Sequence, residues 1–312
     1  MKNARKSFTF IFILLMGIFL AACSDDDRLV DAEAIFSKDF DDELTIHFFH
    51  LDLPEKAGES IFIEAANGKT VLIDAGIPEA GEIVDDYLEE LGIEKIDYVL
   101  PSHPHIDHIG GLHTIFETRE IGEVLEIDVP HDTRTYEKYK QLMEDHEIPF
   151  DTIEAGDKIE LDDDLYMEVL NPPKGTTKDS LEENYSSLGA MHINNVSEVI
   201  RLVHGDNSFL FTGDIYQSKE LELIEEYGEK IKSDVLVAPH HGDGTSSHID
   251  FIEAVDPDIA VIASNINFNE IVNERYEDNH GSELFHNAFH GNILLRSDGK
   301  KIRVIMEKEK EE

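Results

Sequence analysis

The chain has 312 residues, of which 41% are apolar and 30% are charged, a composition that supports a folded core and argues against a disordered chain. The formal net charge is −42 at pH 7 and no cluster of Lys and Arg is visible, so we expect no stable complex with nucleic acid. An acidic surface repels polyanions, but the acidity can equally be an adaptation to salt or to the cell wall that carries no information about the substrate.

Residues 1–22 predict an export signal. Three basic residues precede the apolar segment Phe8–Leu20, which is too short to span a bilayer but has the length of a signal-peptide core. The sequence Leu20-Ala21-Ala22-Cys23 then resembles the lipobox of bacterial lipoproteins, in which the Cys is lipidated and becomes the first mature residue. We therefore expect an extracytoplasmic protein anchored to the bacterial cell membrane through Cys23. The alternative is an ordinary signal peptide with a spare thiol.

The rest of the chain predicts one domain without internal repeats. Residues 23–42 are polar and acidic and predict a tether, residues 43–308 predict the folded domain, and residues 309–312 form a charged tail. Cys23 is the only Cys, so the domain contains no disulfide and depends on its core and on any bound metal for stability.

Hydrophobic periodicity and turn signals predict two successive sets of strands and helices. The first set has strands at Leu44–Phe49, Ser60–Ala65, Thr70–Ala75 and Ile96–Leu100, a hairpin turn at Asn67-Gly68, and helices at Glu82–Leu91 and Thr135–His146. The second has strands at Glu198–Val203, Ser208–Thr212, Asp234–Ala238 and Asp258–Ala263, helices at Gln217–Tyr227 and Ile249–Val255, and a closing hairpin of Asn292–Arg296 and Lys301–Met306. Two sets of strands, each covered by helices, predict an α/β protein with a four-layer αββα sandwich.

A cluster of potential metal ligands follows the strand at Ile96–Leu100. Its members are His103, His105, Asp107 and His108. Alternate positions in an extended chain point the same way, and a turn at 107–108 directs the last two side chains to a second point. Imidazoles and carboxylates are ligands for an ion such as zinc. One isolated His is commonly structural, but three His and one Asp within six residues predict a metal site.

Several further motifs, together with this cluster, carry a resemblance to a known family. They are Leu72-Ile73-Asp74-Ala75-Gly76, Gly110-Gly111-Leu112, Asn194-Asn195-Val196-Ser197, Phe211-Thr212-Gly213-Asp214, Val237-Ala238-Pro239-His240-His241-Gly242 and Asn279-His280-Gly281. Over about residues 44–307 the chain resembles the metallo-β-lactamase superfamily. More narrowly, it resembles the hydrolase domain of the ComEC/Rec2 competence proteins.

This resemblance implies a site with two divalent metal ions, zinc or manganese. It implies the following roles: His103 and His105 hold one ion, Asp107, His108 and His240 hold the other, Asp214 bridges the two, and Asp74 orients a ligand His. It also implies catalytic roles for Asp107, for His241 as a substrate or metal contact, and for His280 as a contact to the substrate's phosphoryl or leaving oxygen.

Four of these assignments have alternatives. His241 rather than His240 could be the ligand, and Asp214 could simply cap the helix that follows it. Asp74 could be a plain turn residue, and His280 could be a surface residue.

The sequence departs from the family at two places. The superfamily often has another His between the first cluster and the bridging Asp, whereas this chain has Asn194–Glu198 there, with His192 nearby. The first ion is then held more loosely, or is manganese rather than zinc, since such sites discriminate weakly. The early Gly-Gln-Gly-Asp segment of the competence-type relatives is replaced by Leu51–Ser60, with Glu59 at the Asp position. That loop borders the cleft in relatives, so the substrate is left open.

The resemblance implies an extracytoplasmic hydrolase in which two ions activate a water. The leading expectation is a phosphodiesterase whose substrate is a phosphodiester-containing or other small molecule. The alternatives are an acyl hydrolase of the lactonase or lactamase kind, and a metal-stabilised binding lipoprotein without turnover. The sequence gives no indication of the oligomeric state.

Overall fold

The computed structural model describes residues 35–36, 43–184, 189–267 and 269–308. The expected signal peptide, Cys23, most of the tether and the charged tail lie outside the described residues.

None of the helices within these ranges is both long enough and apolar enough to cross a membrane.

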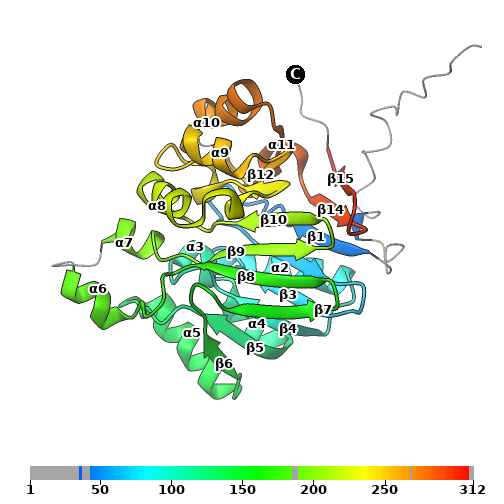
Figure 1. Ribbon diagram of the computed structural model, residues 1–312. Coiled ribbons are helices and arrows are strands. Elements are labelled where there is room, and N and C mark those ends of the chain that lie inside the picture. The colour runs from blue at the N-terminus through cyan, green and yellow to red at the C-terminus, as the bar shows by residue number, and fades with distance from the viewer. Residues whose placement is uncertain (1–34, 37–42, 185–188, 268, 309–312) are drawn as a thin grey trace, which may run out of the picture.

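Two mixed β-sheets form the centre of the molecule (Figure 1). The first has the order β15 (Ile302–Met306), β14 (Ile293–Ser297), β1 (Leu44–Phe48), β2 (Ile61–Glu64), β3 (Thr70–Ile73), β4 (Lys95–Leu100), β5 (Glu120–Glu126) and β6 (Phe150–Thr152). The second has the order β13 (Glu283–His286), β12 (Ile259–Ile262), β11 (Val235–Val237), β10 (Asn207–Phe211), β9 (Val199–His204), β8 (Leu165–Asn171) and β7 (Lys158–Asp162).

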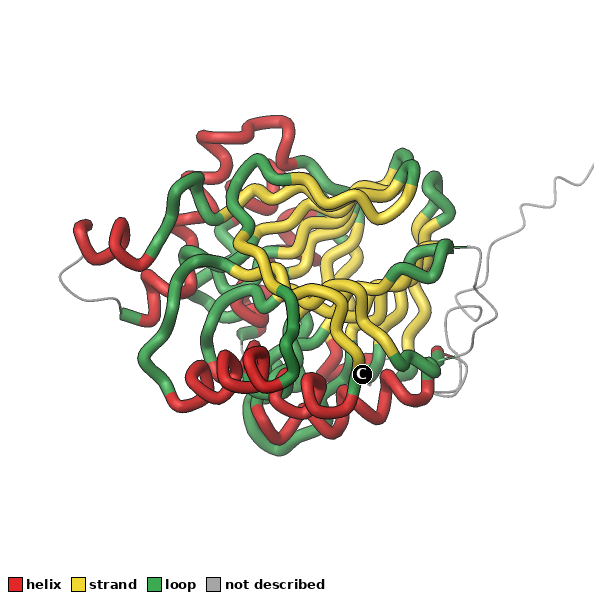
Figure 2. The backbone as a smooth tube through the Cα atoms, turned by 90° about the horizontal axis from the view of Figure 1, so that it is seen from below, coloured by secondary structure: helices red, strands yellow, loops and turns green. Residues whose placement is uncertain are grey.

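Helices cover the outer face of each sheet, and Figure 2 shows the strands enclosed between them. Those whose side chains join the outer core of the first sheet are α2 (Gly81–Glu90), α4 (Leu112–Thr118) and α5 (Arg134–Asp145). Those on the second sheet are α8 (Gln217–Tyr227), α9 (Ile249–Val255), α10 (Glu270–Glu274) and the π-helix η5 (Arg275–His280). Shorter helices lie in the connections: η2 (Pro78–Ala80), α3 (Ile106–Ile109), α6 (Lys178–Asn184), α7 (Ala190–Asn194), η3 (Gly228–Ile231), η4 (Pro239–Gly242) and α11 (Asn287–His290).

Alternating side chains along the strands build the three apolar layers. In β3, Val71 and Ile73 point into the core between the two sheets, whereas Leu72 packs beneath the helices of the first sheet. In β10, Leu210 faces the helices of the second sheet, between two Phe that face the inter-sheet core. Successive side chains of a strand point to opposite faces, so strands that are apolar on both faces require helices outside both sheets. The four-layer αββα sandwich in a single domain is therefore confirmed.

The C-terminal ends of the parallel strands provide the edge on which polar residues gather. Strands β3, β4, β5 and β6 are parallel to one another, as are β10, β11, β12 and β13. In such sheets ligands bind just beyond the carboxyl ends of the strands. The motifs around residues 74, 103–108, 214 and 239–241 all follow directly on these ends.

The structure also adds elements to the expected ones. Strands β5 to β8 and β13 were not predicted, and together they complete both sheets. The C-terminal hairpin does not join the second sheet, because β14 pairs with β1 in an antiparallel register (Figure 1). The two sheets are therefore not simply the two halves of the chain.

Candidate metal centre

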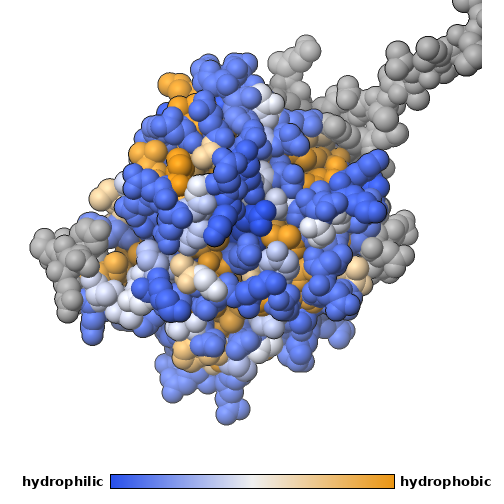
Figure 3. Space-filling model, in the orientation of Figure 1, coloured by the Kyte–Doolittle hydropathy of each residue, from blue (hydrophilic) through white to orange (hydrophobic). Residues whose placement is uncertain are grey.

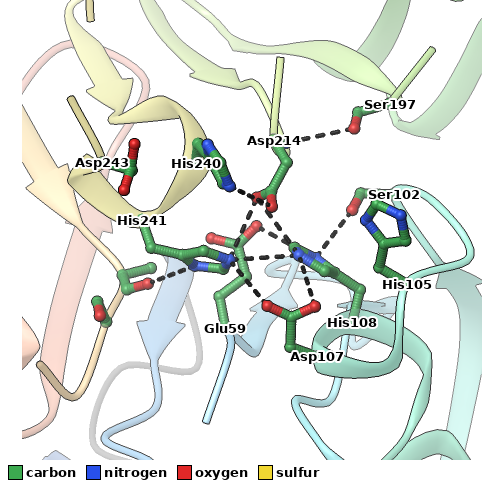
Figure 4. Close-up of polar contacts among 12 residues, drawn as sticks. Glu59, Ser102, His105, Asp107, His108, Ser197, Asp214, His240, His241 and Asp243 are labelled. Carbon is green, nitrogen blue, oxygen red and sulfur yellow. Dashed lines mark hydrogen bonds and ion pairs between the residues drawn. The ribbon is translucent and has the colours of Figure 1, made fainter. Parts of the chain in front are cut away.

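Four side chains converge just beyond the C-terminal ends of strands from both sheets (Figure 4). Asp107 and His108 come from the short helix α3 that follows β4, Asp214 follows β10, and His241 follows β11. Each offers one potential ligand atom, and these atoms all lie within 4.8 Å of one another. Residues more than a hundred positions apart in the sequence thus form one cluster.

The spacing of three of these atoms fits a bound metal ion. His108 Nε2 and His241 Nε2 are 3.3 Å apart, and they lie 3.3 and 3.2 Å from Asp214 Oδ1. Ligand atoms bound tetrahedrally to one zinc ion at its usual bond lengths are separated by about 3.3 Å. Asp214 Oδ1 is buried and has no hydrogen-bond partner of acceptable geometry among the described residues. A buried carboxylate oxygen without a partner is costly, and a cation at this point would satisfy it.

The other oxygen of Asp214 faces a second group of His residues. Asp214 Oδ2 lies 3.5 Å from His240 Nε2 and 3.9 Å from His103 Nε2. His103 Nε2 is in turn 2.9 Å from His105 Nδ1. The carboxylate of Asp214 therefore separates two sets of ligands, one on each oxygen. These buried His and Asp clusters are consistent with a dinuclear metal site.

Asp74 is hydrogen-bonded to the ring nitrogen of His108 that points away from the cluster of ligand atoms. Asp74 Oδ2 lies 2.7 Å from His108 Nδ1 and accepts a hydrogen bond from the Ser102 hydroxyl at 2.7 Å, while Oδ1 accepts from the Ser102 amide at 2.8 Å. A carboxylate bonded to one nitrogen of an imidazole fixes the ring and leaves the other nitrogen free to bind a metal. Asp74 is thus in direct contact with His108, the imidazole that it would orient.

The backbone is strained at three site residues. Asp74, His240 and His241 all have φ of 55°, in the left-handed region that residues other than Gly rarely adopt. Each such residue costs on the order of 1–3 kcal/mol and persists where the surrounding structure enforces it. The two consecutive left-handed residues in η4 turn His241 inward, where it is 1% exposed, and leave the His240 side chain 14% exposed.

Burial keeps His103 and His105 neutral. Burial holds the pKa of His103 well below its usual value and lowers the pKa of His105 to about 4. Both imidazoles therefore have free lone pairs at neutral pH, as metal ligation requires.

The carboxylates of the centre have the opposite effect on His108. Burial disfavours its charge, but the surrounding carboxylates, above all Asp214 and Asp74, outweigh burial and hold the pKa of His108 well above its usual value. Burial likewise disfavours the charge on Asp107, but His108 and His241 outweigh it and hold the pKa of that carboxyl well below its usual value. Excess negative charge thus surrounds the point where the ligand atoms converge.

The structure brings two further residues of the Leu51–Ser60 segment to the centre. Glu59 is buried, its Oε1 lies 4.0 Å from His108 Nδ1, and burial raises its pKa to about 7. Lys56 Nζ lies 2.7 Å from Asp107 Oδ2. The sequence marked Glu59 only as the residue at a family Asp position, and it gave no signal for Lys56, which belongs to no motif.

Two sequence assignments change, those of His240 and of His280, and one alternative is removed. His241, and not His240, lies with Asp107 and His108, which reverses the favoured assignment of these neighbours. Asp214 does not cap a helix, because α8 begins at Gln217 after Tyr216.

His280 lies away from the centre. It precedes β13, which is parallel to β11 and β12, so it lies at the opposite end of these strands from His241. There His280 Nδ1 is 2.8 Å from the Ser282 hydroxyl, and Nε2 is 3.5 Å from Asp256 Oδ1. The structure therefore does not support the expected contact between His280 and a substrate.

The comparisons with known proteins agree with this fold and site. The family model of the metallo-beta-lactamase superfamily matches residues 53–264, which is more than half of the chain, and the chain belongs to this superfamily. Its two mixed sheets with flanking helices are the metallo-beta-lactamase fold. The protein is a metallo-beta-lactamase-fold hydrolase with a His/Asp metal-site cluster.

Curated relatives extend the comparison. ComE operon protein 3 of Bacillus subtilis is 25% identical over 262 residues, covering 77% of this chain and 30% of the relative. Competence protein ComA of Neisseria gonorrhoeae is 28% identical over 244 residues, covering 77% of this chain and 30% of the relative. Endoribonuclease YSH1 of Yarrowia lipolytica is 28% identical over 224 residues, covering 68% of this chain and 26% of the relative. The expected relationship to competence proteins is confirmed, and the chain spans less than a third of the length of these relatives.

Proposed function

We propose that this protein is an extracytoplasmic, lipid-anchored phosphodiesterase that depends on two divalent metal ions. The observation that carries the proposal is the convergence of His108, His241 and Asp107 on Asp214 Oδ1, a buried oxygen with no hydrogen-bond partner among the described residues. The location rests on the lipobox-like sequence that ends at Cys23.

The two sets of ligands divide between the oxygens of Asp214. Asp107, His108 and His241 would hold one ion together with Oδ1. His103, His105 and His240 would hold the other together with Oδ2, so that His240 takes the place of the missing middle His. Such sites accept zinc and manganese, and their ligands discriminate weakly between the two. When bound, the ions supply Lewis acidity and lower the pKa of a coordinated water.

Both acidic residues of this site are proposed ligands, and Asp107 has a second role. Asp214 is 3% exposed and is enclosed by His side chains, so it would act as a ligand alone. Asp107 is 16% exposed and is partly open to solvent. It can also accept a hydrogen bond from a water and orient that water toward a phosphorus atom. Addition of the water and cleavage of the phosphorus–oxygen bond would yield a phosphomonoester and an alcohol, and the alcohol takes up a proton.

The phosphodiester class is supported by the relatives and by an aromatic ring at the site. One relative is named an endoribonuclease, and cleavage of RNA is cleavage of a phosphodiester. The ring of Tyr216 stacks on His240 with centroids 5.0 Å apart, so it would lie close to the ion that His240 would hold. Figure 3 shows a predominantly hydrophilic surface, and together with the net charge of −42 this favours a small substrate over a long polyanion.

A substrate panel tests the proposal. The full chain is loaded with zinc or with manganese and assayed against bis-p-nitrophenyl phosphate, single-stranded DNA, a lactone and a β-lactam. We expect turnover of the phosphodiester that chelation abolishes and that metal restores. Metal-replete protein that cleaves only the lactone or the β-lactam would assign it to acyl chemistry. Metal-replete protein that is inert on every substrate would favour a binding lipoprotein.

A further inference from the structure

Lys56 occupies the boundary between the metal centre and the solvent. Its Nζ lies 2.7 Å from Asp107 Oδ2, and its side chain is 36% exposed. The ammonium group therefore lies against the Asp107 carboxylate, with part of the side chain open to solvent.

The backbone around Lys56 is fixed by contacts with three separate segments. The Asn265 side chain accepts a hydrogen bond from the Ala57 amide at 3.1 Å and donates to the carbonyls of residues 53 and 55, each at 2.8 Å. The Ala57 carbonyl accepts from the Ile77 amide at 2.9 Å. Gly58 has φ of +83° and packs so tightly that an added Cβ would lie 1.7 Å from the Asp107 carbonyl oxygen. A residue held in this way is preorganised for a bound group.

The negative charges around Lys56 make its positive charge important for the binding of an anionic substrate. Asp107, Asp214 and Asp243 all bear on Lys56, and they act in a protein of net charge −42. Bound metal ions would offset part of this negative field, and a further cation at the edge of the site adds to the attraction for an anionic substrate. Lys is a compact charge on a flexible stem with three donors, so it can bind an anionic oxygen while its stem stays anchored.

We propose that Lys56 is the specificity-determining residue that selects anionic over neutral substrates, by binding a non-bridging phosphoryl oxygen with its ammonium group. This inference rests on the proposed phosphodiesterase function. Lys56 is expected to act on substrate binding and not on metal binding, because Nζ carries only donors and cannot ligate an ion while it is protonated.

Two substrates of different charge test the inference. The metal-loaded full chain and its Lys56→Met and Lys56→Arg variants are assayed with bis-p-nitrophenyl phosphate, a monoanion, and with diethyl p-nitrophenyl phosphate, which is neutral. A hydrogen bond to a charged group is worth about 1.5–3 kcal/mol, so Lys56→Met should lower kcat/KM for the diester about 10- to 100-fold, mainly through KM. Lys56→Met should lower kcat/KM for the neutral triester by less than about threefold, which is under about 0.7 kcal/mol. Lys56→Arg should recover most of the activity on the diester.

Lys95→Met is the matched control. Lys95 also pairs with a carboxylate, Glu120, at 3.2 Å, but at the start of β4 and so at the other end of the strand from the centre. Lys95→Met should leave kcat/KM unchanged for both the diester and the triester. Metal content, measured for every variant, should stay at the wild-type level. An equal loss on the diester and the triester, or a loss of bound metal in Lys56→Met, would overturn the inference.

Inorganic phosphate separates this inference from the proposed function. Calorimetry on the metal-loaded chain should show phosphate binding that Lys56→Met weakens about tenfold or more. If the wild-type chain cleaves no phosphodiester but binds phosphate through Lys56, the proposed reaction fails and the anion site stands. If wild type and Lys56→Met bind phosphate equally, the anion site is refuted whatever the reaction.

Discussion

His108 Nδ1 lies 2.7 Å from Asp74 Oδ2, and both side chains are fully buried. Because a carboxylate accepts, Nδ1 keeps a proton, and Nε2, which faces Asp214 and His241, is the nitrogen that would lose its proton to bind an ion. Asp74 itself is held by two hydrogen bonds from Ser102, which directly precedes the His cluster. The tautomer and the direction of a proposed ligand are thus set before any ion binds.

Asp74→Asn should therefore weaken metal binding. An amide cannot accept the Nδ1 proton with the same charge, and loss of such a partner typically costs about 10- to 100-fold in metal affinity. Competition with a chromophoric chelator measures this. Asp97→Asn is the control, because Asp97 accepts the Thr70 amide near the opposite end of β4. Equal affinities for wild type and Asp74→Asn would show that Asp74 does not tune the ligand.

The two adjacent His residues should behave differently when each is combined with Asp107→Ala. His241 and Asp107 are proposed to hold the same ion, so His241→Ala/Asp107→Ala should lose no more metal than His241→Ala alone. His240 faces the other oxygen of Asp214, so His240→Ala/Asp107→Ala should lose more metal than either single variant. His280→Ala, at the far end of the strands, should retain all its metal. The measurement is the metal content per chain after dialysis. If Asp107→Ala added to the metal loss of His241→Ala but not to that of His240→Ala, His240 would be the partner of Asp107.

The sequence predicted the fold because its apolar periodicity and its turn residues mark most of the helices, strands and hairpins clearly. Helix α8 has the predicted bounds, and the turn at Asn67-Gly68 joins β2 to β3 as expected, with Gly68 at φ of +79°. Strand β5 was missed because acidic residues and a Gly interrupt its apolar pattern. Strand β13 was missed because its sequence, Glu-Leu-Phe-His, has only two apolar residues between a charged and a polar one.

The site was predictable only where its residues are close in sequence. The cluster at 103–108 lies within six consecutive residues, so its spacing alone indicated a metal site. The order of His240 and His241 could not be read, since it depends on two left-handed backbone conformations. His280 was misplaced because sequence does not say at which end of a strand a loop lies. Lys56 had no motif, and only the folded loop brings it to Asp107.

A buried acid near the centre should make stability depend on pH. Both carboxylate oxygens of Glu198 are buried and have no hydrogen-bond partner within the described part of the chain. Burial, with Asp74 and Glu126 nearby, holds the pKa of Glu198 well above its usual value of 4.5. The folded chain therefore binds this proton more tightly than the unfolded chain does. The resulting stability is fully present below about pH 4.5 and is lost as pH rises through the raised folded-state pKa.

Glu198→Leu should thus raise the free energy of unfolding of metal-free protein at pH 7.5 by about 1–3 kcal/mol, since it removes an unpaired buried acid. It should also flatten the decline in stability above pH 4.5. Urea unfolding across this pH range measures both effects. Glu253→Gln, on the exposed face of α9, should change neither. Destabilisation by Glu198→Leu would indicate that the carboxyl has a partner that stabilises it.

The membrane anchor is tested at Cys23. Cys23→Ala should release the exported protein from the membrane fraction, because the lipid is attached to this thiol and at least one acyl chain is needed for retention. Cell fractionation and immunoblotting measure the shift to the soluble extracytoplasmic fraction. Unchanged retention at the membrane would remove the lipid anchor from the account.

Asp214→Ala provides the most direct test of the central claim, that one carboxylate joins two metal sites. Asp214 caps no helix, so its loss does not remove a helix cap. Elemental analysis of reconstituted full-length protein should find two ions per wild-type chain. Asp214→Ala should retain fewer than one and should have no detectable phosphodiester turnover. Two ions per chain and undiminished turnover in Asp214→Ala would contradict the account.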